Sequence, residues 1–96
     1  MKIFIDHLFE HNTWANLKMV EKCATLTSAQ LDAEPHGATR GTIRETLYHI
    51  VNSQVGYLSL LSGKPRLFQW QGVASFDELR EAARASGDGL LTLFNG

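Results

Sequence analysis

Three short motifs in the sequence begin with Thr or Ser and carry Gln or Glu three positions later. They are Thr27–Gln30, Thr42–Glu45 and Ser75–Glu78. In such a capping box, the first side chain accepts a hydrogen bond from the backbone of the fourth residue, whose side chain bonds back to the first. The motifs therefore predict a short helical turn after Thr27 and two long helices, one beginning at Ile43 and one after Ser75.

The length of the chain limits what these helices can build. With 96 residues, of which 44% are hydrophobic, the chain has material for one core. It is too short for a Rossmann sheet or a TIM barrel. We therefore treat residues 1–96 as a single domain or part of one.

The first segment, from about Ile3 to Leu26, contains no Pro or Gly and has the 3.6-residue period of an amphipathic helix. Asn12 falls within its apolar stripe, so we expect Asn12 to have a buried hydrogen-bond partner. The residues expected to face the core are Phe4, Ile5, Leu8, Ala15, Met19, Cys23 and Leu26.

The two later helices show the same period. The second should end at Ser62, with Gly63 as a left-handed cap. In the third, Gly87 and Gly89 each cost about 1 kcal/mol relative to Ala, so we expect it to be weak or kinked there. The residues expected on the two apolar stripes are Ile43, Leu47, Ile50, Gln54, Leu58 and Leu61, and then Phe76, Leu79, Ala83, Leu90 and Phe94. No segment alternates as a strand does, so the sequence predicts an all-α, antiparallel helical bundle.

The net charge and the single cysteine limit the binding partners and the cellular compartment that we expect. A net charge of -1 lacks the basic face that nucleic acids or anionic membranes require. No apolar run approaches a membrane span or a secretory signal. Cys23 has no disulfide partner and lies on an apolar stripe, so we expect a buried, unreactive thiol in a cytoplasmic protein.

His49 is the strongest candidate for chemistry. At 100° per residue, Glu45, Ser53, Gly56 and Leu60 lie within about 40° of it, well away from the apolar stripe of the same helix. The small residues Ser53 and Gly56 would leave room beside the imidazole for a ligand or another helix. A neutral imidazole is a common metal ligand, although a lone helical histidine is more often exposed or hydrogen-bonded in a core.

The other candidates carry weaker signals. His7 and His11 are four residues apart, a spacing that can hold zinc, but no third ligand accompanies them and we expect a partly exposed pair. Trp14 and Trp70 are expected to pack against the bundle. His36, in the loop before Gly41, is assigned no role.

Two segments resemble a known family. The run His11–Leu17 (HNTWANL) resembles the "(Y/H)NxWAN" signature in the first helix of DinB-like proteins, also grouped with the YfiT-like metalloenzymes. The run Gly41–Ile50 (GTIRETLYHI) resembles the "GSIRDTLxHI" start of their second helix. The Leu-Ser-Gly-Lys-Pro end of that helix and the Ser75–Leu79 start of the third match in type and order.

The resemblance implies an up-down four-helix bundle of DinB/YfiT type and a divalent metal, zinc or nickel, held by three histidines. His49 matches the first ligand; the other two would come from a later helix at H-x-x-x-H spacing. The sequence has no histidine after His49. We therefore expect three helices of the four, in a domain that is C-terminally incomplete and has an incomplete metal site.

Two functions follow from this resemblance. One is a metal-dependent enzyme of the thiol-dependent transferase or hydrolase/isomerase type, acting on a small-molecule thiol or another small substrate, with Glu45 and Ser53 as neighbours of the metal. The alternative is a non-catalytic module that dimerises or binds a partner helix. Three helices without a fourth would leave an apolar seam, which predicts a homodimer.

Overall fold

The computed structural model describes residues 2–33, 41–70 and 74–95, apart from the side chains of Lys2, Ile3, Ile5 and Asn95. The described residues form four helices and no strand: α1 (Lys2–Ala24), α2 (Ser28–Asp32), α3 (Ile43–Ser62) and α4 (Phe76–Asn95). They give an elongated body of 43 × 27 × 25 Å. The prediction of an all-α bundle is confirmed.

The capping boxes define the helix starts as predicted. At α3, Glu45 N donates to Thr42 Oγ1 and Thr42 N donates to Glu45 Oε1, both at 3.1 Å. The same reciprocal pairs form at Thr27 with Gln30 and at Ser75 with Glu78. Gly63 ends α3 with φ 72°, and its N–H donates to Ser59 O at 3.0 Å. Only glycine adopts this left-handed backbone without strain.

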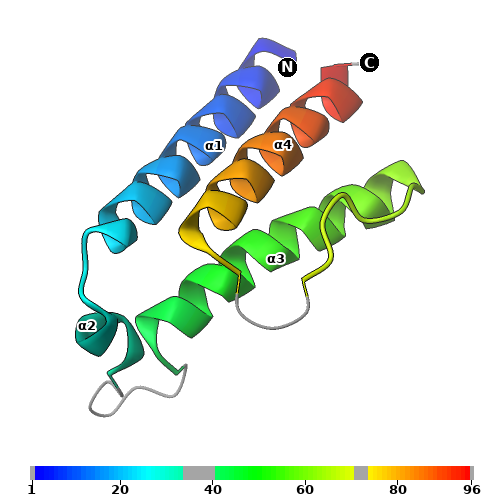
Figure 1. Cartoon of the computed structure of the whole chain (residues 1–96). Coiled ribbons are helices and arrows are strands. Elements are labelled where there is room, and N and C mark those ends of the chain that lie inside the picture. The colour runs from blue at the N-terminus through cyan, green and yellow to red at the C-terminus, as the bar shows by residue number, and fades with distance from the viewer. Residues whose placement is uncertain (1, 34–40, 71–73, 96) are drawn as a thin grey trace.

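Helix α4 packs along both α1 and α3, whereas α1 and α3 touch each other only sparsely. In Figure 1, α1 and α4 run side by side in opposite directions, and α2 lies at the start of α3. Helices α3 and α4 run in the same general direction, because the connection that follows α3 returns along that helix before α4 begins. The predicted antiparallel, up-down order therefore holds for α1 with α4 but is wrong for α3 with α4. The Arg44 guanidinium joins α3 to α2 through Asp32 Oδ1, at 2.7 Å.

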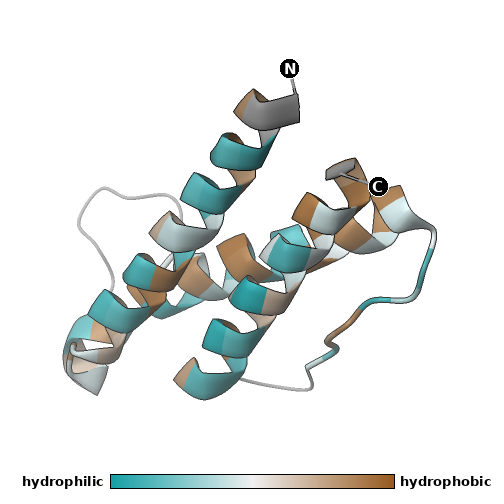
Figure 2. Cartoon of the chain, turned by 90° about the horizontal axis from the view of Figure 1, so that it is seen from above, coloured by the Kyte–Doolittle hydropathy of each residue, from teal (hydrophilic) through white to brown (hydrophobic). Residues whose placement is uncertain are grey.

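The core lies where the three long helices meet. Figure 2 shows hydrophobic residues recurring along α3 and α4 between polar ones. The buried apolar side chains are mostly short, which lets the helix backbones approach closely. They include Val20 of α1, Leu47, Val51, Val55 and Leu58 of α3, and Leu79, Ala82, Ala83 and Leu90 of α4.

The apolar stripe predicted for residues 3–26 is wrong at three positions in α1 but correct at its C-terminal end, where Cys23 is buried and Leu26 packs against the core. Phe4 and Leu8 are 66% and 54% exposed, and Met19 is also exposed, although Cys23 is buried as expected. The face of α1 that meets α4 instead includes Phe9, which stacks on Phe94 with ring centroids 5.1 Å apart. The helix carries two apolar faces, and periodicity alone does not say which of them α4 covers.

The predictions for α3 and α4 hold better at their centres than at their ends. Leu47, Gln54 and Leu58 are buried as predicted, but Ile43 and Leu61 at the ends of α3 are exposed. Phe94, near the end of α4, is 49% exposed. Side chains near a helix end have neighbours on fewer sides, which explains these differences.

The two glycines of α4 act as contact points, and the expected weak or kinked segment does not interrupt the helix. A Cβ built at Gly87 would overlap Thr13 Oγ1 of α1, and one built at Gly89 would lie 2.6 Å from Leu58 Cδ2 of α3. The missing side chains therefore let both neighbouring helices approach α4. Their cost in helix propensity is offset by this packing.

Candidate functional site

A polar side chain at the centre of the bundle fixes the orientation of α3. Gln54 Oε1 accepts hydrogen bonds from Asn12 Nδ2 at 2.9 Å and from Asn16 Nδ2 at 3.1 Å, both on α1. Its Nε2 donates to Ser86 Oγ at 2.7 Å and to Ala83 O at 3.2 Å on α4. This amide is 9% exposed and joins all three long helices. The partner expected for Asn12 is therefore Gln54, although Asn12 itself is exposed.

With α3 held in this orientation, His49 lies on the helix surface. Its side chain is exposed, as are Glu45 and Leu60, while Ser53 and Gly56 are half-buried. These five residues form what we call the His49 face. The structure confirms that His49 lies outside the core. Within the described part of the chain, no residue hydrogen-bonds to its imidazole.

The space expected beside Gly56 is already filled by the protein itself. Arg66, in the connection after α3, folds back so that its Nη1 would lie 2.8 Å from a Cβ at Gly56. Its Nη2 donates to Asn52 O at 3.2 Å and also to Asn52 Oδ1. No motif pointed to Arg66, because its position depends on how the connection folds rather than on local spacing.

Glu45 caps α3, which limits its ability to bind a metal or a substrate next to His49. One of its carboxylate oxygens, Oε1, accepts the Thr42 backbone hydrogen bond that caps α3. Ser53 differs, since the described residues provide no hydrogen bond to its hydroxyl. Among the described residues, Ser53 is therefore the neighbour of His49 whose polar group has no hydrogen-bond partner.

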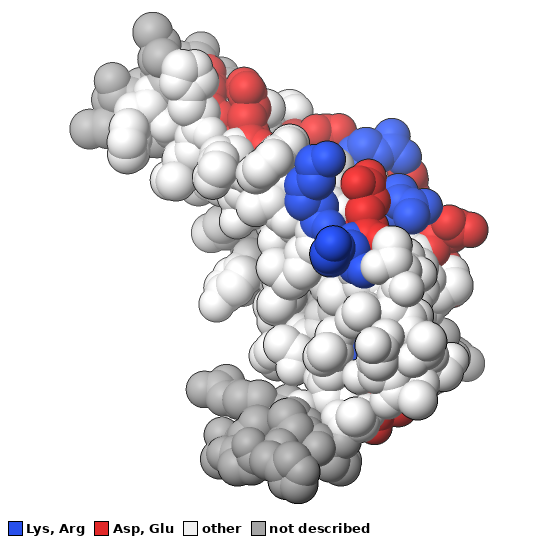
Figure 3. Space-filling view, turned by 90° about the vertical axis from the view of Figure 1, so that its left-hand side faces the viewer, with Lys and Arg blue, Asp and Glu red and all other residues white. Residues whose placement is uncertain are grey.

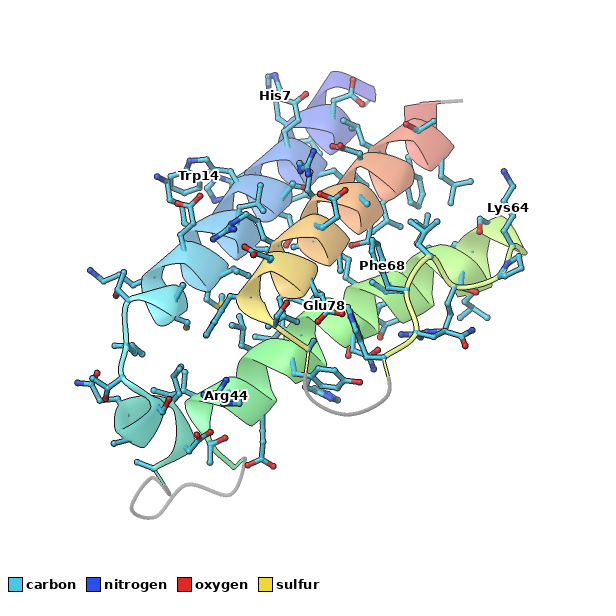
Figure 4. The ribbon with its side chains drawn as sticks, viewed as in Figure 1. His7, Trp14, Arg44, Lys64, Phe68 and Glu78 are labelled. Carbon is cyan, nitrogen blue, oxygen red and sulfur yellow. The ribbon has the colours of Figure 1, made fainter. Side chains whose placement is uncertain are left out.

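The histidines of α1 are separate from this face. Figure 4 shows His7 and Trp14 projecting from the outer side of α1, away from α3 and α4. His11 stacks on Trp14 with ring centroids 5.6 Å apart, and both histidines are exposed. Trp14 is 56% exposed, so the prediction that it packs in the bundle is wrong.

Trp70 packs as predicted, against the flank of α3. Its ring meets Tyr48 edge-on at 5.5 Å and stacks on Phe68 at 6.0 Å. Figure 4 places Phe68 between its connection and the helices. This aromatic cluster holds the connection, and with it Arg66, along one side of the His49 face.

Cys23 is buried, and burial raises the pKa of its thiol. The predicted burial of Cys23 is confirmed, and desolvation disfavours the thiolate, which is the reactive form. His36 and its loop, as well as Gly72, lie outside the described residues.

A cavity of about 360 Å³ lies on another side of the molecule, between the end of α3, the connection after it, and α4. Its wall is mainly apolar and includes Leu58, Leu67 and Leu93, with Lys64 and Asp88 also in the lining. The sequence did not predict it, because the cavity forms only when residues after Gly63 fold back over α4. Its polar lining residues are Ser59, Ser62, Lys64, Asp88 and Thr92, of which only Asp88 carries a carboxylate that could bind a metal ion.

Neither a charged surface patch nor a group of metal-binding side chains marks a further site in the described part of the chain. Figure 3 shows basic and acidic side chains interleaved on one face, and on α4 the ion pairs are Arg80 with Asp77 and Arg84 with Glu81. No three His, Cys, Asp or Glu side chains among the described residues come together in a metal-binding group. None of the described helices is both long and apolar enough to cross a membrane.

Comparison with known proteins supports the resemblance found in the two signature segments. The sequence model of the DinB family matches residues 1–92, nearly the whole chain. No curated protein and no solved structure gives a significant match.

Proposed function

Because the chain belongs to the DinB family, we propose that it forms part of a metal-dependent enzyme of the thiol-dependent transferase or hydrolase/isomerase type. In this enzyme His49 is one of the metal ligands. The observation that carries this proposal is the position of His49. The imidazole is exposed on α3 and takes no hydrogen bond from the described residues. It is therefore free to bind a divalent ion such as zinc or nickel.

One histidine does not make a metal centre. A catalytic zinc site has three protein ligands and a water, and the described residues of one molecule supply no such group. Glu45 caps α3, and His7 projects from the outer side of α1. The proposal therefore requires further ligands from residues outside the described part or from another molecule, and we assign no reaction step to His49 alone.

The test is metal retention by the 96-residue protein. After incubation with Zn²⁺ or Ni²⁺ and gel filtration, we expect metal to co-elute with the wild type and with a His11→Ala control. It should fall markedly in His49→Ala. Elemental analysis that finds no metal on the wild type, or the same amount on His49→Ala, contradicts the proposal.

A second candidate function rests on exposed apolar side chains of α1 and α3. Phe4, Leu8 and Met19 of α1 and Ile43, Tyr57 and Leu61 of α3 are each at least 39% exposed. On helical geometry, both sets flank the contact of Asn12 and Asn16 with Gln54, on the side away from α4. We call these six residues the α1/α3 apolar surface.

We propose that a second copy of this protein packs against the α1/α3 apolar surface. None of its six members is charged, so two copies can meet there without repulsion between like charges. Exposed apolar patches commonly mark an interface. This homodimer is the non-catalytic alternative, and it is compatible with a site at His49.

Light scattering on the purified protein tests this pairing. We expect a dimer for the wild type and a monomer for Leu8→Glu, because the new carboxylate would be buried in the interface. Leu60→Glu is the matched control, since Leu60 is 76% exposed but lies on the His49 face. A folded wild-type monomer, or a Leu8→Glu dimer, contradicts the pairing.

A further inference from the structure

Arg66 is held in one place by α3. Its Nη2 donates to both oxygens of Asn52, and its guanidinium lies against the backbone at Gly56. A side chain at position 56 would collide with Nη1, at 2.8 Å from the Cβ. The glycine therefore leaves room for the guanidinium, which two hydrogen bonds hold against α3.

This fixed cation has no acidic partner among the described residues. The ion pairs there use Arg44, Arg80 and Arg84, whereas Arg66 bonds only to the neutral oxygens of Asn52. Arginine stays charged in proteins, and both of its bonds here come from Nη2. The N–H groups of Nε and Nη1 find no acceptor in the described part of the chain.

The neighbours of Arg66 on the His49 face complete a small amphipathic site. Ser53 has a hydroxyl without a described hydrogen-bond partner and lies one turn before Gly56. Leu60, one turn after Gly56, offers a largely exposed apolar side chain. His49 lies seven residues before Gly56 on the same face, which is roughly 10 Å along the helix.

We propose that Arg66 binds the carboxylate of a small organic acid on the His49 face. A guanidinium fork matches the planar pair of carboxylate oxygens, and the charge-assisted hydrogen bonds are stronger than those to neutral acceptors. The Ser53 hydroxyl can donate to the same group, and Leu60 can contact the apolar part of the acid. That this acid is the substrate of a site at His49 rests on the proposed function. That Arg66 binds a carboxylate does not depend on it.

The experiment uses the full 96-residue protein, freed of metal with EDTA, and benzoate as the probe. Amide NMR signals of Ser53 and Gly56, and the Arg66 Nε–H signal, are followed during the titration. We expect saturable shifts in the wild type and in Arg84→Gln, whose native side chain pairs with Glu81 on α4. Arg66→Gln should weaken binding at least tenfold, and Arg66→Lys should weaken it less.

Benzamide, the neutral analogue of benzoate, keeps the test valid if Arg66→Gln fails to fold. On the wild type it should leave the Arg66 Nε–H signal unchanged. The proposal is overturned if benzoate causes no shift at Gly56, if benzamide matches benzoate, or if folded Arg66→Gln binds benzoate as tightly as the wild type. His49→Ala should retain benzoate binding. A wild type that binds benzoate but retains no metal would count only against the proposed function.

Discussion

Gly87 of α4 lies so close to Thr13 of α1 that a Cβ added to the glycine would overlap Thr13 Oγ1 and lie 3.0 Å from Cγ2. Gly87 is fully within the packed interface, where α1 and α4 run side by side. We predict that Gly87→Ala destabilises the protein by about 2 kcal/mol, because overpacking outweighs the gain in helix propensity of about 1 kcal/mol. Urea denaturation followed by circular dichroism measures this.

The neighbouring glycine provides the comparison for this prediction. A Cβ at Gly89 meets the end of the flexible Leu58 side chain, which can shift, so Gly89→Ala should cost less than Gly87→Ala. Adding Thr13→Ala to Gly87→Ala should recover part of the loss. Equal stability of Gly87→Ala and the wild type would show that α1 and α4 are not packed this closely.

The second prediction concerns the side-chain amide of Gln54, whose oxygen accepts and whose nitrogen donates hydrogen bonds. Gln54→Glu keeps the acceptor for Asn12 and Asn16 but places a carboxylate oxygen against Ala83 O, where the amide now donates. We expect this variant to lose about 2–3 kcal/mol at pH 7. The buried carboxyl should have a raised pKa, so the deficit should shrink when it is protonated at low pH.

Thermal melts of Gln54→Glu and the wild type at pH 7 and pH 4 measure this difference. Gln54→Leu, which has no charge, should lack the pH-dependent part of the loss. A deficit for Gln54→Glu that is the same at both pH values would mean that the carboxylate is not buried against α4.

Local sequence signals specified the helix starts but not how the helices face one another. The caps at Thr42 and Ser75 and the turn at Gly63 depend on neighbouring residues, and each was predicted correctly. The covered face of α1 depends on α4, which lies far away in the sequence, so periodicity selected Phe4 and Leu8 in place of Phe9. The outward position of His49 follows from its angular place on α3 itself, so it was predictable. The arrival of Arg66 at Gly56 depends on how a connection elsewhere in the chain folds, so it was not.

The cap of α3 gives a third prediction. Thr42 is 7% exposed, and its hydroxyl accepts from Glu45 N at 3.1 Å. Thr42→Ala removes this acceptor and should cost about 1 kcal/mol. Thr42→Ser keeps the hydroxyl and should stay closer to the wild type in the same denaturation measurement. If the two variants lose equal stability, the effect comes from packing of the methyl group and not from the cap.

The buried thiol of Cys23 gives the last prediction. Since burial raises its pKa in the folded protein above the ordinary value of 9.0, the native state holds less thiolate than the unfolded one at any pH near that value. Reaction with Ellman's reagent at pH 8 should therefore be much slower in the native protein than in urea. The contribution of Cys23 to stability is complete below pH 9.0 and is lost as the pH rises through the higher folded pKa. Native-state labelling as fast as in urea would show that α1 exposes Cys23, and Cys23→Ala should remove this part of the alkaline loss of stability.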